Sequence, residues 1–181
     1  HYNLPSSGKT VRVYSNADTV QLFLNDTLLA VQGPDNDVST TNLSHPPFTF
    51  TVDEYIPGTI RAVGLRKGSG FGIHSVTTPG PPASLRLSAD FSNKPLRADG
   101  SDVVFVYATL VDSLGYPVMT ADSTVEFSVR GDATLIGDNP VRAEAGIATA
   151  LLRAGTNPGK VMVRASSGTM SEAEIMTETK K

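Results

Sequence analysis

The chain has 181 residues, a formal net charge of −3 and no cysteine. The lack of cysteine excludes disulfide frameworks, thiolate metal sites and cysteine nucleophiles, and the scattered Lys and Arg residues argue against a nucleic-acid-binding surface. The longest apolar runs fall far short of the roughly 20 residues that span a bilayer, so we expect neither nucleic acid nor a membrane as a partner.

The first 78 residues have the pattern of short strands separated by turns. The chain opens on His1 with no signal peptide, which indicates a mature or excised fragment. Asn25-Asp26 tolerates the positive φ of a two-residue hairpin, so we predict a tight turn there. Residues 33–47 are polar and contain three prolines, which predicts a long loop of the kind that is often functional. Alternation of β-branched and aromatic residues predicts strands over 11–14, 20–24, 27–31, 48–52, 59–65 and 73–76.

Residues 79–82, Pro-Gly-Pro-Pro, separate two halves of the chain. Proline has no backbone N–H for a β-ladder and pushes the preceding residue into an extended conformation. We therefore predict a semi-rigid linker at 79–82, between one domain at 1–78 and a second at 83–181.

The second half shows the same pattern of short strands separated by turns. Residues 103–111 form the longest apolar run and should lie centrally, whereas 84–88 has the pattern of an edge strand. No window shows the apolar stripe and caps of a core helix. Short strands at this spacing predict an all-β fold of two tandem immunoglobulin-like (Ig-like) β-sandwiches. The remaining strands are predicted over 125–129, 134–136, 147–152, 160–164 and 173–175.

Several segments resemble one family, and they occur in that family's order. VRVYSNADTVQLFLN at 11–25, PGTIRAVG at 57–64 and TTPGPPASLRL at 77–87 look like the region after the catalytic barrel in bacterial glycoside hydrolase family 2 enzymes of the β-galactosidase type. In the second half, ADGSD at 98–102 and VDSLGYPV at 111–118 are similar to invasin/intimin Ig-like repeats.

The resemblance implies a non-catalytic C-terminal region that contacts the catalytic and N-terminal domains of the same parent chain. Such a region supports the barrel, shapes substrate access or makes homo-oligomer contacts. The family's barrel and its paired glutamates lie outside these 181 residues, so no catalytic residue is transferred. The loop at 33–47 is our candidate for reaching the catalytic domain. We expect a periplasmic or secreted bacterial location ahead of a cytoplasmic one. The alternatives are a carbohydrate-binding module and an adhesion or stalk segment of a surface protein.

The residues themselves predict no catalytic, cofactor or metal site. Retaining glycoside hydrolysis needs two carboxyl groups about 5–5.5 Å apart. Asp35 with Asp37 is interpreted as a solvated loop, and the adjacent Asp53 and Glu54 should point to opposite faces. The histidines lack the clustered spacing of a zinc site. Four aspartates could share a calcium ion at one end of the second domain but lack an Asp-x-Asp-x-Asp run: Asp112, Asp122, Asp132 and Asp138.

The remaining candidate sites are a glycine-rich segment, which could bind phosphate, and aromatic residues, which could bind carbohydrate. No helix follows the glycine-rich residues 68–72, so we interpret them as a flexible hairpin loop rather than a phosphate loop. Most aromatic residues lie in alternating strands, where core packing is expected: Tyr14, Phe23, Phe48, Phe50, Phe105 and Phe127. Three others lie in or near turns and are the candidate carbohydrate contacts: Tyr55, Phe71 and Tyr116.

Overall fold

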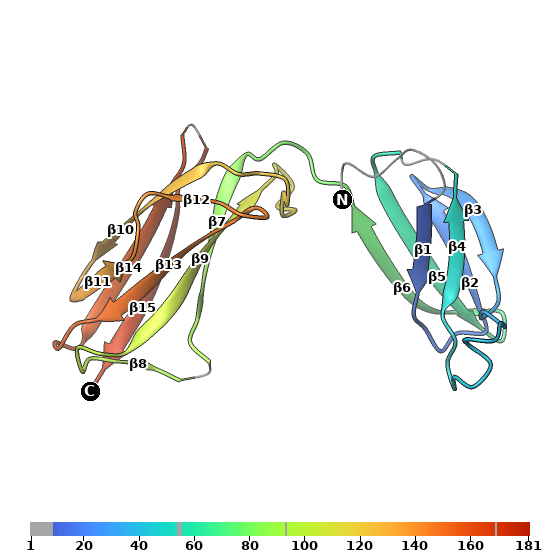
Figure 1. Ribbon diagram of the computed structural model, residues 1–181, viewed down its shortest axis with the longest axis horizontal. Coiled ribbons are helices and arrows are strands. Elements are labelled where there is room, and N and C mark those ends of the chain that lie inside the picture. The colour runs from blue at the N-terminus through green and yellow to red at the C-terminus, as the bar shows by residue number, and fades with distance from the viewer. Residues whose placement is uncertain (1–8, 54–55, 93, 169) are drawn as a thin grey trace. The chain divides into compact units, whose positions relative to one another are not determined.

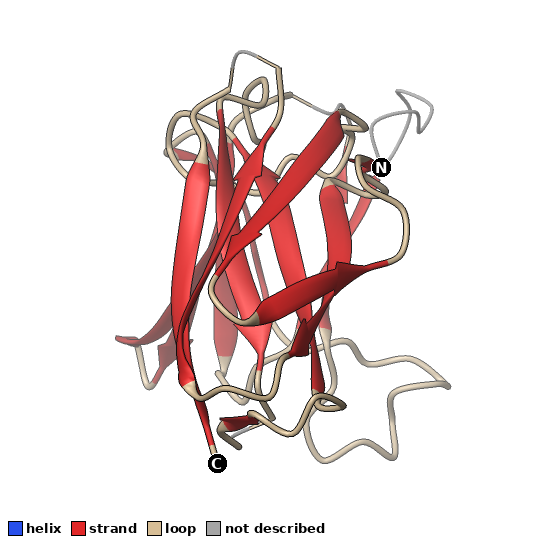
Figure 2. Ribbon diagram, turned by 90° about the vertical axis from the view of Figure 1, so that its left-hand side faces the viewer, coloured by secondary structure: helices blue, strands red, loops and turns tan. Residues whose placement is uncertain are grey.

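The computed structural model describes residues 9–53, 56–92, 94–168 and 170–181. Strands and loops make up this part of the chain, and it contains no helix, so no helix in it could cross a membrane (Figure 2). The chain divides into two compact units, His1–Thr78 and Pro79–Lys181. The fold is all-β, with two tandem Ig-like β-sandwiches joined by a proline-rich linker, as the sequence predicts.

The first unit pairs a four-stranded sheet with a two-stranded one (Figure 1). The larger sheet has the order β3-β2-β5-β6, and the smaller consists of β1 and β4. All these pairings are antiparallel. The strands are β1 (Lys9–Val13), β2 (Thr19–Leu24), β3 (Thr27–Gln32), β4 (Phe48–Val52), β5 (Thr59–Arg66) and β6 (Ser69–Thr77).

The core of the first unit lies between these two sheets. Alternate residues of β2, Val20 and Leu22, are fully buried and pack in one cluster with Phe48 and Phe50 of β4. The predictions that Phe48 and Phe50 belong to the core are thus confirmed. A strand residue's neighbours point to the opposite face, so the residue between Leu22 and Leu24 faces away from this core.

That residue is Phe23, and its predicted place in the core is wrong. It is half-buried on the other face of the sheet, where the Arg61 guanidinium lies 4.3 Å from its ring centroid. The expectation that Tyr14 lies in the core is also wrong, because Tyr14 follows the end of β1 and is exposed.

The second unit pairs a four-stranded sheet with a five-stranded one. The orders are β11-β13-β9-β7 and β12-β10-β14-β15-β8, and among the described strand-to-strand ladders only β15–β8 is parallel. The central position of β9 and the edge position of β7 confirm the predictions. The strands are β7 (Ser84–Asp90), β8 (Leu96–Arg97), β9 (Val103–Val111), β10 (Thr124–Arg130), β11 (Ala133–Ile136), β12 (Val141–Arg142), β13 (Ile147–Ala154), β14 (Gly159–Ser166) and β15 (Ala173–Lys180).

The core of the second unit takes alternate residues from both of its sheets. Val106 of β9 and Val125 of β10 have no exposed surface, and Phe127 of β10 is buried beside them as predicted. Phe105, however, points outward and is exposed, with its ring stacked 6.1 Å from that of Tyr107. The expectation of a buried Phe105 is therefore wrong.

Two-residue turns set the register of the first unit's hairpins. Asn25 and Asp26 have φ values of 48° and 64° and join β2 directly to β3, which confirms the predicted turn. Lys67 and Gly68 join β5 to β6 in the same way. Because β6 begins at Ser69, the interpretation of residues 68–72 as a flexible loop is wrong.

Candidate functional site

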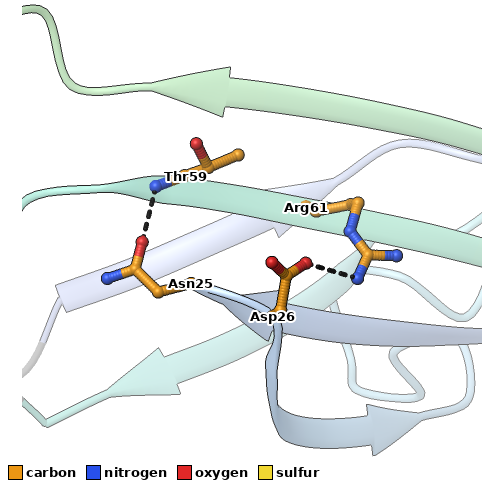
Figure 3. Close-up of polar contacts among 4 residues, drawn as sticks. All are labelled: Asn25, Asp26, Thr59 and Arg61. Atoms are coloured by element: carbon orange, nitrogen blue, oxygen red, sulfur yellow. Dashed lines mark hydrogen bonds and ion pairs between the residues drawn. The ribbon is translucent and has the colours of Figure 1, made fainter.

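Polar contacts at the tip of the β2–β3 hairpin fix it to β5 (Figure 3). The Thr59 N–H donates to Asn25 Oδ1 at 2.9 Å, and the Asn25 N–H donates to the Thr59 carbonyl at 3.0 Å. Arg61 donates to Asp26 Oδ1 at 3.1 Å. Asp26 is largely exposed, so this ion pair adds little stability and mainly neutralises the Arg61 charge.

The carboxylates of the long loop are structural anchors. Asp35 accepts hydrogen bonds from the Thr49 N–H at 3.0 Å and the Thr49 hydroxyl at 2.5 Å, which ties the loop to β4. Asp37 accepts from the N–H groups of Ser39 and Thr40 and so closes a local turn. The other predicted pair is only partly described, since Glu54 lies outside the described residues.

Three of the four aspartates proposed as calcium ligands, Asp112, Asp122 and Asp132, have separate structural partners. The Asp122 carboxylate pairs with Arg142, whose side chain lowers the pKa of that acid. Asp132 accepts from the backbone N–H of Asn157 at 2.7 Å and from its side chain at 3.0 Å, and both lower the pKa of Asp132. Within the described residues, no group of three His, Cys, Asp or Glu side chains is placed to hold a metal ion.

Asp112 fastens the proline-rich linker to the second unit. Asp112 as a residue is only 4% exposed, and its carboxylate accepts hydrogen bonds from the N–H groups of Gly80 at 2.8 Å, Leu114 at 2.9 Å and Tyr116 at 2.8 Å. Burial acts to raise the pKa of Asp112, but the backbone N–H donors outweigh it and hold the pKa below the ordinary value of 3.8. Gly80 is therefore part of the second unit's hydrogen-bonded structure.

Replacing Asp112 with asparagine is expected to lower the Tm of the second unit by several degrees at neutral pH. The amide presents a single acceptor oxygen to these donors, whereas the carboxylate presents two. Because the folded-state pKa is depressed, the carboxylate stabilises the fold above the ordinary pKa, and this contribution is lost as the pH falls through the folded-state value.

The Tm gap between wild type and variant should therefore be constant above about pH 5 and should narrow below about pH 3. Calorimetry across this range tests the effect, with the exposed Asp138→Asn in the same unit as the control. A gap that does not change with pH would contradict the role assigned to the Asp112 charge.

Two of the three candidate carbohydrate contacts, Phe71 and Tyr116, lie within the described residues. Phe71 is 44% exposed but lies within β6 rather than in a turn, and the Arg66 guanidinium lies 3.9 Å from its ring centroid. Tyr116 is 41% exposed and belongs to the turn that Asp112 organises. Phe71 and Tyr116 belong to different units. Tyr55 lies outside the described residues, and the carbohydrate role of all three stays a prediction.

A hollow of about 690 Å³ in the second unit was not predicted from the sequence. Its acidic side chains bond to their own turns, since Asp99 accepts from the N–H groups of Ser101 and Asp102, both at 2.8 Å, and Asp102 accepts from the Arg97 N–H at 2.8 Å. These contacts account for the carboxylates without a ligand. The hollow is lined by Asp90, Phe91, Ser92, Lys94, Pro95, Leu96, Arg97, Asp99, Ser101, Asp102, Val103 and Val104.

Two family profiles match the chain, one in each half. The profile described as "Glycoside hydrolase family 2 C-terminal domain 5" matches residues 85–176, which are 92 of the 181 residues. The profile described as "Domain of unknown function (DUF4982)" matches residues 7–70. The two matches fall on either side of the proline-rich linker.

Relatives and solved structures match nearly the whole chain. A beta-galactosidase of Thermoanaerobacter pseudethanolicus is 32% identical over 99% of this chain and 26% of the relative. Beta-galactosidase BoGH2A of Bacteroides ovatus is 29% identical over 90% of this chain and 19% of the relative. The crystal structure of a glycosyl hydrolase family 2 member from Bacteroides cellulosilyticus aligns with 100% of this chain and 24% of its own, at 31% identity and a TM-score of 0.81. The chain thus spans about a quarter or less of the length of these proteins.

Proposed function

Because the chain belongs to the glycoside hydrolase family 2 C-terminal domain 5 family, we propose that it is the non-catalytic accessory region of a family 2 glycoside hydrolase of the β-galactosidase type. Its two sandwiches support the catalytic barrel of the parent chain, and the reaction takes place on residues outside these 181. The coverage of the relatives carries this proposal. A beta-galactosidase aligns with 99% of this chain through only 26% of its own length, which leaves most of such a protein for catalysis.

The hydrogen bonds of the acidic side chains support the non-catalytic role. Asp35, Asp112 and Asp132 each use their carboxylate oxygens on neighbouring N–H or hydroxyl groups. A carboxylate held in this way contributes to the fold, whereas a catalytic acid or nucleophile must be free to meet the substrate. These acids are thus committed to structure.

The test is a set of substitutions in the full-length parent. Replacing Asp35, Asp112 or Asp132 with asparagine should leave kcat for a chromogenic β-galactoside within about threefold of wild type, whereas removing a general acid or base costs about 10²–10⁴-fold. Assays are run well below the Tm, with circular dichroism to confirm folding. A loss of the larger size at any acidic residue of this chain, in a folded variant, would overturn the proposal.

A carbohydrate-binding module is the second candidate, and the exposed ring of Tyr116 favours it. Its signature is retarded migration of the 181-residue chain in gels that contain polysaccharide. Retardation that is lost on Phe71→Ala, Tyr116→Ala or Tyr55→Ala would favour this second function. Unretarded migration in gels of the parent's own substrate polymer would contradict the carbohydrate-binding function, and the accessory role would be the one function left.

A further inference from the structure

The larger sheet of the first unit leaves one face uncovered by β1 and β4. Its register places Val31 of β3, Gln21 of β2, Val63 of β5 and Ile73 of β6 in one row across this face. Three of these four side chains are apolar. Val31 is 50% exposed and Ile73 is 70% exposed, so both ends of the row are open to solvent.

The rows on either side add further apolar side chains, interspersed with polar ones. In one of them, Leu28 of β3 lies opposite Phe23, and Phe23 lies opposite Arg61. In the other, Leu65 lies opposite Thr19. We call the apolar side chains of these three rows the outer face: Phe23, Leu28, Val31, Val63, Leu65 and Ile73.

The opposite surface of the same sandwich differs sharply in composition. Thr10 pairs with Thr51, and Arg12 pairs with Thr49, on the side of β1 and β4 that points away from the core. A sheet surface made of threonine and arginine side chains is typical of a surface in water. Single exposed apolar residues are ordinary, but contiguous apolar rows mark an interaction surface. The two sides of this sandwich are therefore built for different surroundings.

The edge strand β6 points to the same conclusion. It is nine residues long, borders the sheet, and is exposed at every position except Thr77. Its sequence SGFGIHSVT contains no Lys, Arg, Asp, Glu or Pro. Soluble proteins usually protect a long edge strand with such residues or cover it. We infer that β6 is covered along with the outer face.

The side chains of the outer face are better suited to contact an apolar protein surface than a sugar or a charged ligand. A sugar ring stacks on a free aromatic face, but Arg61 covers Phe23 and Arg66 covers Phe71 in the adjoining strand. A charged ligand needs an unpaired charge, but Asp26 neutralises Arg61. The relatives leave about three quarters of their length outside this region, which supplies ample surface of the same chain.

We propose that the outer face and β6 dock on an uncharged apolar surface in the remainder of the parent chain. This inference rests on the accessory role proposed above and adds the surface through which that role is carried out. Interface cores are apolar and poor in charge, and the charge that these three rows contain, on Arg61, is neutralised by Asp26. The polar face of Thr10, Arg12, Thr49 and Thr51 then remains in solvent.

Hydroxyl-radical footprinting of the full-length parent tests the proposal. Each side chain is its own reference when its oxidation rate in the parent is compared with its rate in the 181-residue chain. Leu28, Val31 and Ile73 should react about tenfold more slowly in the parent, because an interface core excludes water. Leu114, which is exposed in the second unit, serves as a residue outside the proposed surface.

Matched lysine pairs give a second measurement in the parent. Val31→Lys with Ile73→Lys places two charges on the outer face, whereas Thr10→Lys with Thr51→Lys places them on the polar face, and all four positions are exposed. Only the first pair should lower the Tm of the parent. Neither pair should change the Tm of the first unit in the 181-residue chain by more than about 2 °C, because exposed substitutions have small effects.

Each outcome bears on the proposal. Equal oxidation rates in an active parent, or equal effects of the two lysine pairs, would overturn it and leave the accessory role intact. Protection that disappears on dilution would also overturn it, because the occupant would then be a second copy of the chain. A parent that hydrolyses no glycoside would instead count against the proposed function.

Discussion

Replacing Phe50 with alanine is expected to unfold the first unit and leave the second folded. Phe50 is 1% exposed and belongs to a core cluster of only six buried apolar residues among the described residues, against 18 in the core cluster of the second unit. A buried Phe→Ala substitution costs about 3–5 kcal/mol. Small domains have total stabilities of only about 5–15 kcal/mol. A unit with so small a core is expected at the low end of that range, where this single change is enough to unfold it.

Phe23→Ala is the matched control for this prediction. It removes the same atoms from a strand of the same unit, but Phe23 is half-exposed on the outer face. Its loss should cost about 1 kcal/mol, because exposed positions lack the cavity contribution. Hydrogen exchange with mass spectrometry measures each unit separately in the 181-residue chain. Loss of protection in both units together, or equal costs for the two variants, would contradict the prediction.

Local sequence patterns predict most of the strands because each shows either period-two alternation or, over 103–111, a continuous apolar run. The predicted bounds 48–52 and 103–111 coincide with β4 and β9. The two short strands β8 and β12 were not predicted, because two residues cannot display a period. They exist only because neighbouring strands supply hydrogen-bond partners, and these partners are set by tertiary structure.

The misplaced aromatic residues differ in how much signal the sequence offers. In Thr19–Leu24 the apolar residues Val20, Leu22 and Leu24 share one phase, so strict alternation places Phe23 on the opposite side with Gln21. The alternation therefore indicates an outward Phe23 more strongly than its aromatic character indicates burial. In Val103–Val111 nearly every residue is apolar. The phase is therefore undetermined in the sequence, and only the packing of the two sheets decides that Phe105 points outward.

The candidate sites depend on distant partners and so could not be predicted from the sequence. Asp112 takes its linker contact from Gly80, and Asp35 takes its partner Thr49 from another segment of the chain. Residue types at such separations carry no local pattern. The outer face is likewise the product of strand register, because its rows join residues from four strands. The sequence could nevertheless have indicated it, since β3 and β6 lack charged residues.

Replacing Gly146 with alanine is expected to destabilise the second unit by about 2–5 kcal/mol, the sum of backbone strain and overpacking. Gly146 has a φ of 77° and follows Ala145 in the turn between Glu144 and Ile147. A methyl group there would collide with the Val118 carbonyl oxygen and lie 2.9 Å from its carbonyl carbon. The backbone has little room to move, because the Gly146 N–H donates to Ala121 and its carbonyl accepts from Leu110.

Gly115→Ala separates the two contributions in the same unit. Gly115 has a φ of 84°, but an added methyl group would meet no atom within 4 Å, so only strain of about 1–2 kcal/mol is expected. Denaturant unfolding of both variants measures the difference, which isolates the cost of the collision with Val118. Equal losses at the two positions would show that the turn shifts freely. The close approach of residues 118 and 146, which brings the segment after β9 onto the start of β13, would then not hold this sandwich together.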